Sequence, residues 1–266
     1  MAGDTFSGPV LRDIVRKRSD VLDSLAAGPA DKPALVDRVG VSRSTVDRAV
    51  DSLVEAGLIR RRDGRYHVTE QGRLALTTYE EYVERTDALA AAGPVLAGLP
   101  GDVSVDRRLV ETGTVRIAEP HAPESAITEA VRELEAAQEL FVFSPVVKSN
   151  YVRPVYEEVA ERGLEATLVL EGGATESLAS LAEVTGVVES LLAADSFSLY
   201  RTERDLPFML YLMRGAESDA VGITVHEDGG IVGSVTSRDP DAVAWGRELF
   251  DEVLEDTDPV PSASLL

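Results

Sequence analysis

The sequence predicts an α+β protein with two parts: a short helical segment that closes with a β-hairpin, and a longer segment of alternating strands and helices. Three observations predict this division. Apolar residues recur at helical spacing over residues 10–56, Asp63-Gly64 separates two short strand patterns, and short apolar runs alternate with amphipathic stretches beyond residue 102. A chain of 266 residues is long enough for two domains.

Two helices are predicted before residue 40. The first covers residues 10–25, where apolar positions recur every three or four residues, and Gly28-Pro29 ends it. The second covers residues 32–39, because Asp31 can cap its N-terminus and Gly40 can take the left-handed conformation that stops a helix.

A third helix is predicted from Arg43 to Ala56, with Ser42 as its N-cap. Its apolar residues share one face, and the opposite face carries small polar and charged side chains. A helix, a tight turn and a helix that begins with such residues are typical of a helix-turn-helix, whose second helix enters the major groove of DNA. The polar face consists of Arg43, Ser44, Asp47, Arg48 and Asp51.

Residues 58–62 and 65–68 are predicted to form a hairpin, because Asp63-Gly64 is a strong two-residue turn signal. The hairpin carries four arginines and would serve as the wing beside a helix-turn-helix. Arginine suits contacts with phosphates and the narrow minor groove. A charged helix face by itself is equally explained as a solvated surface, so the DNA-binding prediction depends on the ordered combination of helix, turn, helix and wing.

The distribution of charge supports placing DNA binding in residues 1–77 alone. The chain carries 26 Lys+Arg and 47 Asp+Glu, a formal net charge of -21, but residues 1–77 hold 13 basic and 11 acidic residues while residues 78–266 hold 13 and 36. Phosphate binding depends on Lys and Arg, so only the first part suits a polyanion. The absence of Cys excludes disulfides and thiolate metal sites.

Three segments carry a family resemblance: residues 35–46, residues 53–59 that lead into the basic hairpin, and Thr69-Glu70-Gln71-Gly72. Over residues 9–76 the chain resembles archaeal winged helix-turn-helix regulators of the MarR, ArsR and TrmB grouping. The resemblance implies binding to double-stranded promoter DNA. It assigns base contacts to Arg43, Ser44, Thr45, Asp47 and Arg48, and backbone contacts to Arg60, Arg61, Arg62 and Arg65.

The segment after the wing is predicted to form a helix from Thr69 to Ala92. In related regulators such a helix joins two protomers, so we expect a homodimer; a connecting helix packed on its own domain is the alternative. The turn-rich stretches 91–94 and 99–102 mark a boundary. The predicted domains are therefore a DNA-binding domain at 1–76, a linker or dimerisation helix at 77–101, and an α/β effector or assembly domain at 102–266.

The C-terminal pattern predicts a parallel strand-helix-strand crossover among further strands and helices. The expected strands are Val103–Val105, Thr114–Ala118, Leu140–Phe143, Leu164–Leu170, Phe197–Arg201, Phe208–Met213, Val221–Val225 and Ile231–Val235. The expected helices are Glu124–Gln138, Tyr151–Arg162, Thr175–Ala193 and a final helix opened by Asp239-Pro240.

No catalytic residue, metal site or cofactor is predicted. The histidines at 67, 121 and 226 have no metal-ligand spacing, and residues 171–174 lack the full dinucleotide-binding fingerprint. The order of elements resembles the phospholipase-D-like domains of TrmB-type and methanogenesis-regulator-type archaeal proteins. Active phospholipases of that class use an H-x-K-x(4)-D motif, whereas His226-Glu227-Asp228 places an acid where the lysine belongs, so hydrolysis is not expected.

A ligand site is predicted in the loop 144–151, which leaves the first strand of the crossover, because ligands bind at the carboxyl ends of parallel strands. Lys148 beside a helix start would suit a small, anionic effector. Alternatively, Ser149 only caps the helix and Lys148 is solvated. The candidate ligand-binding residues are Ser144, Lys148, Asn150, Tyr151, Arg201 and His226.

Together these patterns predict a dimeric transcriptional regulator, with an N-terminal winged helix-turn-helix followed by a C-terminal α/β effector domain. Two alternatives stay open: an enzyme with a phosphodiesterase-like pocket, and a structural DNA-binding protein without a sensor. The acid-rich chain with three Lys and one Asn resembles proteins of halophilic archaea. The chain has no long apolar segment and no signal-like start, so a cytoplasmic location without membrane contact is expected.

Overall fold

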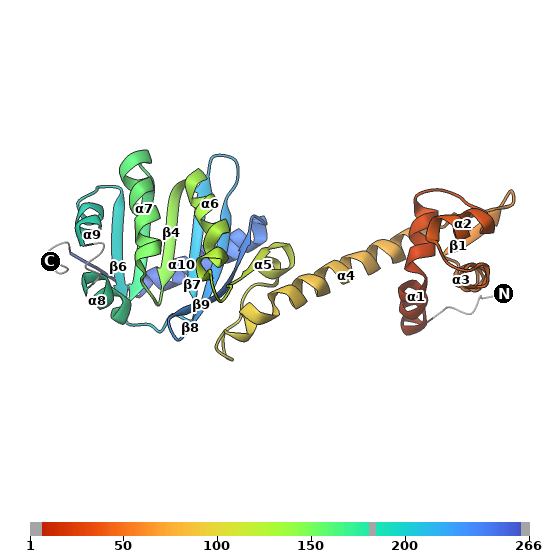
Figure 1. Cartoon of the computed structure of the whole chain (residues 1–266), viewed down its shortest axis with the longest axis horizontal. Helices are drawn as coiled ribbons and strands as arrows, with labels where there is room; N and C mark the ends of the chain where they lie inside the picture. Colours follow the sequence, from red (N-terminus) through yellow and green to blue (C-terminus); the bar gives the residue numbers. More distant parts are fainter. Residues whose placement is uncertain (1–6, 181–184, 262–266) are drawn as a thin grey trace. The chain divides into compact units, whose positions relative to one another are not determined.

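The computed structural model describes residues 7–180 and 185–261 (Figure 1). It divides into two compact units, one up to Asp87 and one from Ala88. The N-terminal unit is helical with a two-stranded sheet, and the C-terminal unit has an eight-stranded sheet with helices. The predicted α+β fold class is confirmed. Among the described helices, none is long and apolar enough to cross a membrane.

The N-terminal unit forms the predicted helices and hairpin because their ends are set by local signals. Asp31 Oδ1 accepts a hydrogen bond from the Ala34 amide at 2.9 Å, and Ser42 Oγ accepts one from the Thr45 amide at 3.2 Å. Gly40 ends its helix in the left-handed conformation. The elements are α1 (Gly8–Ala26), α2 (Lys32–Val39), α3 (Arg43–Glu55), β1 (Ile59–Arg62), β2 (Arg65–Val68) and the start of α4 (Glu70–Ala97).

Strand β2 of the hairpin is hydrogen-bonded to the segment between α1 and α2. Asp63 and Gly64 both have positive φ, 52° and 78°, which gives the tight turn that matches strand twist. Behind the turn, the Tyr66 amide donates to the Ala30 carbonyl at 2.8 Å, and the Ala30 amide donates to the Tyr66 carbonyl. Tyr66 is buried in the helical core. The wing is thus held by both backbone and side-chain contacts.

The C-terminal unit is built on one sheet in the strand order β10-β6-β5-β4-β7-β8-β9-β3. Strands β4, β5 and β6 are parallel and the other pairs are antiparallel, which confirms the predicted crossover. The strands are β3 (Thr114–Ile117), β4 (Ala137–Ser144), β5 (Glu165–Glu171), β6 (Phe197–Thr202), β7 (Met209–Gly215), β8 (Ala220–Glu227), β9 (Gly230–Ser237) and β10 (Asp258–Pro259). The helices are α5 (Arg107–Thr112), η1 (Pro123–Ile127), α6 (Thr128–Ala136), α7 (Ser149–Arg162), α8 (Gly172–Ser180), α9 (Thr185–Leu192) and α10 (Pro240–Glu255).

Helices cover both faces of this sheet (Figure 1). One face packs against α10, α5 and the last turns of α4, through side chains such as Phe250, Leu109 and Val95. The opposite face packs against α6, α7, α8 and α9. The second face carries the buried hydroxyls of Tyr211 and Thr224 among its apolar residues.

Several predicted elements are wrong. Residues 91–94 were expected to form a turn but lie inside α4. Ala92 and Val95 are fully buried, and their packing stabilises the helix on both sides of the exposed Pro94. Val103–Val105 is not a strand: its valines pack on the core, but β3 already occupies the sheet edge.

Two predicted helices have different bounds in the structure. The helix expected at 124–138 is a 3-10 turn followed by α6, and residues 137–138 begin β4 instead. The helix expected at 175–193 is two helices, α8 and α9, and residues 181–184 lie outside the described part of the chain. Neither α5 nor β10 was predicted.

Candidate functional site

The N-terminus of α3 presents hydroxyl and guanidinium groups on an exposed surface. Arg43, Ser44 and Arg48 are exposed, while Thr45 is half-buried. Ser42 Oγ lies 3.0 Å from Ser44 Oγ and 2.9 Å from Thr45 Oγ1, so these hydroxyls form one cluster around the helix cap. An exposed helix start with such groups can hydrogen-bond base edges or phosphates.

Asp47, unlike the other residues predicted to contact bases, forms an ion pair within the chain. Its Oδ1 lies 2.8 Å from Lys32 Nζ on α2, and Lys32 also lies 3.8 Å from Asp51. The hydrogen bond from Lys32 lowers the pKa of the Asp47 carboxyl and raises the pKa of the Lys32 ammonium. The pair therefore joins α2 to α3 and neutralises an acid on the polar face.

The wing places its basic side chains on two faces. Strand pairing aligns Arg60 with His67 and Arg62 with Arg65, so these four side chains share the outer face. Arg61 lies on the other face, with its guanidinium 5.9 Å from the ring centre of Tyr66. His67 was not predicted as a site residue, although the hairpin register alone would have placed it beside Arg60.

A second surface of the N-terminal unit is apolar. A shallow groove runs between α1 and α4, lined by residues such as Leu11, Val15 and Tyr79. Leu74 and Tyr82 on α4 are 63% and 64% exposed, which is high for large apolar side chains. Exposed apolar surface of this kind is typical of protein contact sites.

In the C-terminal unit, two of the six candidate ligand residues contact β8 or its turn, and a third, His226, lies on β8 itself. Tyr151 Oη lies 2.8 Å from His226 Nε2, and Lys148 Nζ donates to the Gly229 carbonyl. Arg201 is placed elsewhere: at the end of β6 it pairs with Glu203 at 2.9 Å. The predicted residues therefore do not form one pocket.

Burial changes the acid-base properties of this contact. The pKa of His226 is lowered to about 4, mainly by burial and further by the positive charge of Lys148, so the imidazole is neutral near pH 7. Burial also raises the pKa of the Tyr151 phenol. Both groups are thus uncharged hydrogen-bonding groups at neutral pH.

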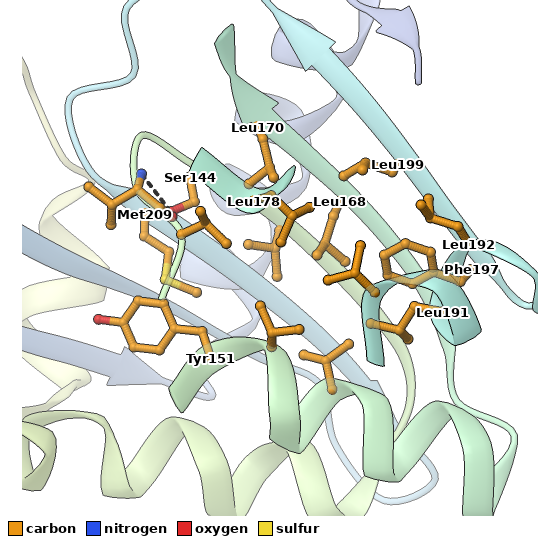
Figure 2. Close-up of a pocket in the computed structure, with 16 residues that line it drawn as sticks. Ser144, Tyr151, Leu168, Leu170, Leu178, Leu191, Leu192, Phe197, Leu199 and Met209 are labelled. Atoms are coloured by element: carbon orange, nitrogen blue, oxygen red, sulfur yellow. Dashed lines mark hydrogen bonds between the residues drawn. The ribbon is translucent and has the colours of Figure 1, made fainter. Parts of the chain in front are cut away.

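Next to this contact, the sheet and helices enclose an apolar cavity, here called the first cavity (Figure 2). Tyr151 and Met209 lie at one end of the labelled residues, and Phe197 and Leu192 lie at the other. Its free volume is about 70 Å³. It is lined by Val142, Ser144, Val146, Val147, Tyr151, Val152, Val155, Leu168, Leu170, Leu178, Val188, Leu191, Leu192, Phe197, Leu199 and Met209.

A second cavity adjoins the first and shares four of its lining residues, Val142, Tyr151, Val155 and Met209. It extends toward α6 and β8 and has a free volume of about 60 Å³. Asn150 lines it, and so do residues that were not predicted as site residues, some from η1, α6 and α7 and the others from strands β4, β7 and β8. These are Ile127, Ala130, Val131, Leu134, Leu140, Pro154, Tyr211, Met213 and Thr224.

Comparison with known proteins identifies the family. Residues 120–256 match the model for the middle domain of the methanogenesis regulatory protein FilR1, which is just over half of the chain. The chain belongs to this FilR1 family. Residues 13–90 also match a family described as the HVO_A0261 N-terminal domain. The resemblance to regulators with a methanogenesis-regulator-type C-terminal domain is thereby confirmed. No curated protein matches the chain.

Solved structures show more distant similarity to this FilR1-family chain. TrmBL2, an archaeal chromatin protein, is 15% identical with a TM-score of 0.42, covering 96% of this chain and 100% of its own. NucT from Helicobacter pylori is 10% identical with a TM-score of 0.42, covering 56% and 98%. Nuc from Salmonella typhimurium, a phospholipase D family member, is 9% identical with a TM-score of 0.42, covering 56% and 99%. At these values the similarity assigns no function.

Proposed function

We propose that this FilR1-family chain is a transcriptional regulator whose N-terminal unit binds double-stranded promoter DNA. The observation that carries the proposal is the arrangement of α3 and the wing, which present exposed arginines and hydroxyls from one small, locally determined unit. The description of the family as a regulatory protein agrees with this role. Non-specific attraction would come from the N-terminal unit alone, because the rest of the chain is strongly acidic.

The α3 helix would supply sequence recognition. Arg43, Ser44 and Arg48 are exposed and would reach base edges in the major groove, with Arg48 Nε donating to the Ser44 carbonyl at 3.2 Å. Thr45 would contribute through the hydroxyl cluster at the cap, and Asp47 would act mainly through its pair with Lys32. The outer face of the wing would contact the DNA backbone through Arg60, Arg62 and Arg65, with Arg61 as a weaker contributor.

The apolar groove between α1 and α4 would join two copies of the chain. Leu74 and Tyr82 project from the same helix at a spacing of eight residues, so a second copy of α4 could cover both. A two-fold dimer would bind a palindromic operator. Size measurement by light scattering tests this: Leu74→Glu/Tyr82→Glu is expected to give monomers, whereas a dimer in that variant would contradict the assigned surface.

The C-terminal unit would act as a sensor rather than as an enzyme. His226 is half-buried and its Nε2 is engaged with Tyr151, so it is poorly placed to attack a phosphodiester. Its neutral state and the two adjoining cavities instead favour ligand binding. A ligand with different affinities for two dimer arrangements would shift their populations and so change DNA affinity. Phosphodiesterase activity lost in His226→Ala would contradict this role.

Fluorescence anisotropy tests the DNA-binding proposal directly. The full chain is titrated onto a labelled fragment of the DNA upstream of its own coding sequence, in high KCl. The variant Arg43→Ala/Arg48→Ala is expected to lose at least about tenfold in affinity, because each base-contacting arginine contributes ~1–3 kcal/mol. The control Arg107→Ala/Arg132→Ala removes the same charge from exposed positions of the C-terminal unit. Equal binding by both double variants would overturn the proposal.

A further inference from the structure

We infer that the two adjoining cavities form one binding site for an uncharged amphiphile: a narrow hydrocarbon chain or flat ring bearing a single hydroxyl, carbonyl or amide group. The inference rests on the proposed sensing role of the C-terminal unit and names the chemistry that the unit would sense. The apolar part would fill the first cavity, and the polar group would reach the second. Tyr151 and Val155, which line both cavities, would lie beside the junction.

The first cavity offers almost nothing for a polar ligand to bind. Fourteen of its sixteen lining residues are apolar, and the exceptions are Ser144 and Tyr151. Ser144 Oγ donates to the Val146 carbonyl at 2.6 Å and accepts from the Val146 amide at 3.3 Å (Figure 2). Tyr151 is hydrogen-bonded to His226. Because both groups already have hydrogen-bond partners, the lining of the first cavity favours a hydrocarbon ligand.

The second cavity has unsatisfied polar groups. Thr224 is 1% exposed, and its hydroxyl has no hydrogen-bond partner within the part of the chain that the structure describes. The side-chain oxygen of Asn150, which lines the same cavity, is also buried without a partner there. Buried polar atoms are nearly always hydrogen-bonded, so two such atoms at one cavity indicate a missing partner. A ligand hydroxyl or carbonyl would supply it.

The ligand should be uncharged because, among residues 7–180 and 185–261, no charged side chain lines either cavity. Lys148, the cation that the sequence suggested for an anionic effector, donates to the Gly229 carbonyl and lies outside both linings. A carboxylate in this site would be buried without a counter-charge, which is strongly unfavourable. The polar lining atoms at the end of the site are a hydroxyl and an amide, which pair well with a neutral group.

The size of the site favours small molecules. The free volume is about 70 Å³ in the first cavity and about 60 Å³ in the second. Space this small suits a polymethylene chain or a single aromatic ring better than a sugar or a nucleotide.

Three matched compounds test the ligand class on the full chain: 4-butylphenol, butylbenzene and 4-butylbenzoate. Each displaces the fluorescent probe N-phenyl-1-naphthylamine, whose emission rises in apolar surroundings. We expect 4-butylphenol to bind more tightly than butylbenzene, and 4-butylbenzoate at pH 8 to bind at least about tenfold more weakly than the phenol, because it carries a charge. Benzoate binding equal to that of the phenol would overturn the inference.

Two variants locate the site. Val155→Phe fills the junction of both cavities and should lower probe affinity by about tenfold or more. Its control, Val243→Phe, makes the same substitution at a half-buried position of α10 on the opposite face of the sheet. Circular dichroism establishes that both variants fold. Unchanged probe binding in folded Val155→Phe, or an equal loss in Val243→Phe, would contradict the assigned site.

Substitutions of Thr224 test whether its hydroxyl binds the polar group of the ligand or only supports the fold. Thr224→Val keeps the shape and removes the hydroxyl, so affinity for 4-butylphenol should fall about three- to tenfold, as expected for one lost hydrogen bond, while butylbenzene binding stays unchanged. Thr224→Ser should restore phenol binding. Equal losses for both compounds in Thr224→Val would overturn the polar contact.

Failure of this inference is distinguishable from failure of the proposed function, because probe binding and DNA binding are measured separately. A chain that binds operator DNA but none of the three compounds would contradict the site and leave the regulator function intact. A chain that shows the predicted ligand pattern but binds no DNA would support the site and contradict the regulator function.

Discussion

The two units of this chain place their polar chemistry in opposite locations. The N-terminal unit exposes it: Arg43, Arg48 and the outer face of the wing meet solvent, above a core made of apolar side chains. The C-terminal unit encloses it, since Thr224, Asn150 and the contact between Tyr151 and His226 lie between a sheet and its helices. An exposed polar surface suits a large partner, whereas an enclosed one suits a small molecule.

The units also differ in how they acquire these sites. All the residues proposed to contact DNA lie between positions 43 and 65, within one helix and one hairpin. The two cavities collect residues from positions 127 to 224, on strands and helices that meet only through the sheet order. A site made by neighbours in sequence can be read from local patterns. A site made by distant strands depends on the whole sheet.

The wing offers the largest expected effect and tests whether the face of the hairpin decides which of its exposed arginines bind DNA. Replacing Arg60, Arg62 and Arg65 with Ala should weaken operator binding by about 10²–10³-fold and reduce the salt-dependence slope by about three, one unit per lost phosphate contact. Arg61→Ala, on the inner face beside Tyr66, is the control and should have a smaller effect than any single outer-face variant. Anisotropy titrations at several KCl concentrations measure both quantities. A larger loss from Arg61→Ala would reverse the assignment of faces.

The second-largest expected effect is a loss of stability, because packing is tight around Tyr211 beside the second cavity. A methyl group on Gly222 would overlap the ring and hydroxyl of Tyr211, whose Oη lies 2.5 Å from Thr236 Oγ1. Gly222→Ala should therefore destabilise the C-terminal unit by about 1–3 kcal/mol. Urea unfolding followed by the fluorescence of Trp245, the single tryptophan of the chain, measures it.

The control for this prediction is Gly173→Ala, at a position where an added methyl group meets no other atom. It should leave stability unchanged or slightly raised, since alanine favours the helical backbone. Equal stability of the Gly222→Ala and Gly173→Ala variants would show that Tyr211 is not packed as described.

Burial of His226 predicts that the C-terminal unit loses stability in mild acid. Its folded pKa of about 4 lies below the unfolded value near 6.5, so the unfolded chain takes up the proton first. This contribution is complete above pH 6.5 and is lost as the pH falls toward 4, by about 2 kcal/mol after allowance for partial exposure. Unfolding curves of the wild type and His226→Gln between pH 7.5 and 4.5 measure the difference. Parallel pH dependence in the two proteins would contradict a buried neutral imidazole.

The pair formed by Lys32 and Asp47 gives the smallest expected effect, because it is exposed. Lys32→Ala would leave the Asp47 carboxylate unpaired near the DNA and should weaken operator binding by about two- to fivefold. Adding Asp47→Asn should restore the affinity. If the double variant binds as weakly as Lys32→Ala, Lys32 contacts DNA itself and does not act through Asp47.

Local signals explain which parts of the fold were predictable. Ser42, Gly40 and Asp63-Gly64 act on the backbone next to them, and the predicted helix and hairpin ends were confirmed there. Tertiary contacts explain the errors. Burial of Ala92 and Val95 keeps a Gly-Pro pair within α4, although the pair alone favours a turn.

By itself, the sequence determined the α+β class, the winged helix-turn-helix and the separation of charge between the two units, because these depend on residue type and on neighbours within a few turns of chain. Only the tertiary structure decided which face of the wing each arginine occupies and that Lys32 is paired with Asp47. It also decided that Lys148 and Arg201 lie outside the cavities while Thr224 lies inside. The physical reason is packing between elements: it sets which face of the hairpin lies on the helices, which helices form ion pairs and which side chains of distant strands share an interior, and no local pattern contains those contacts.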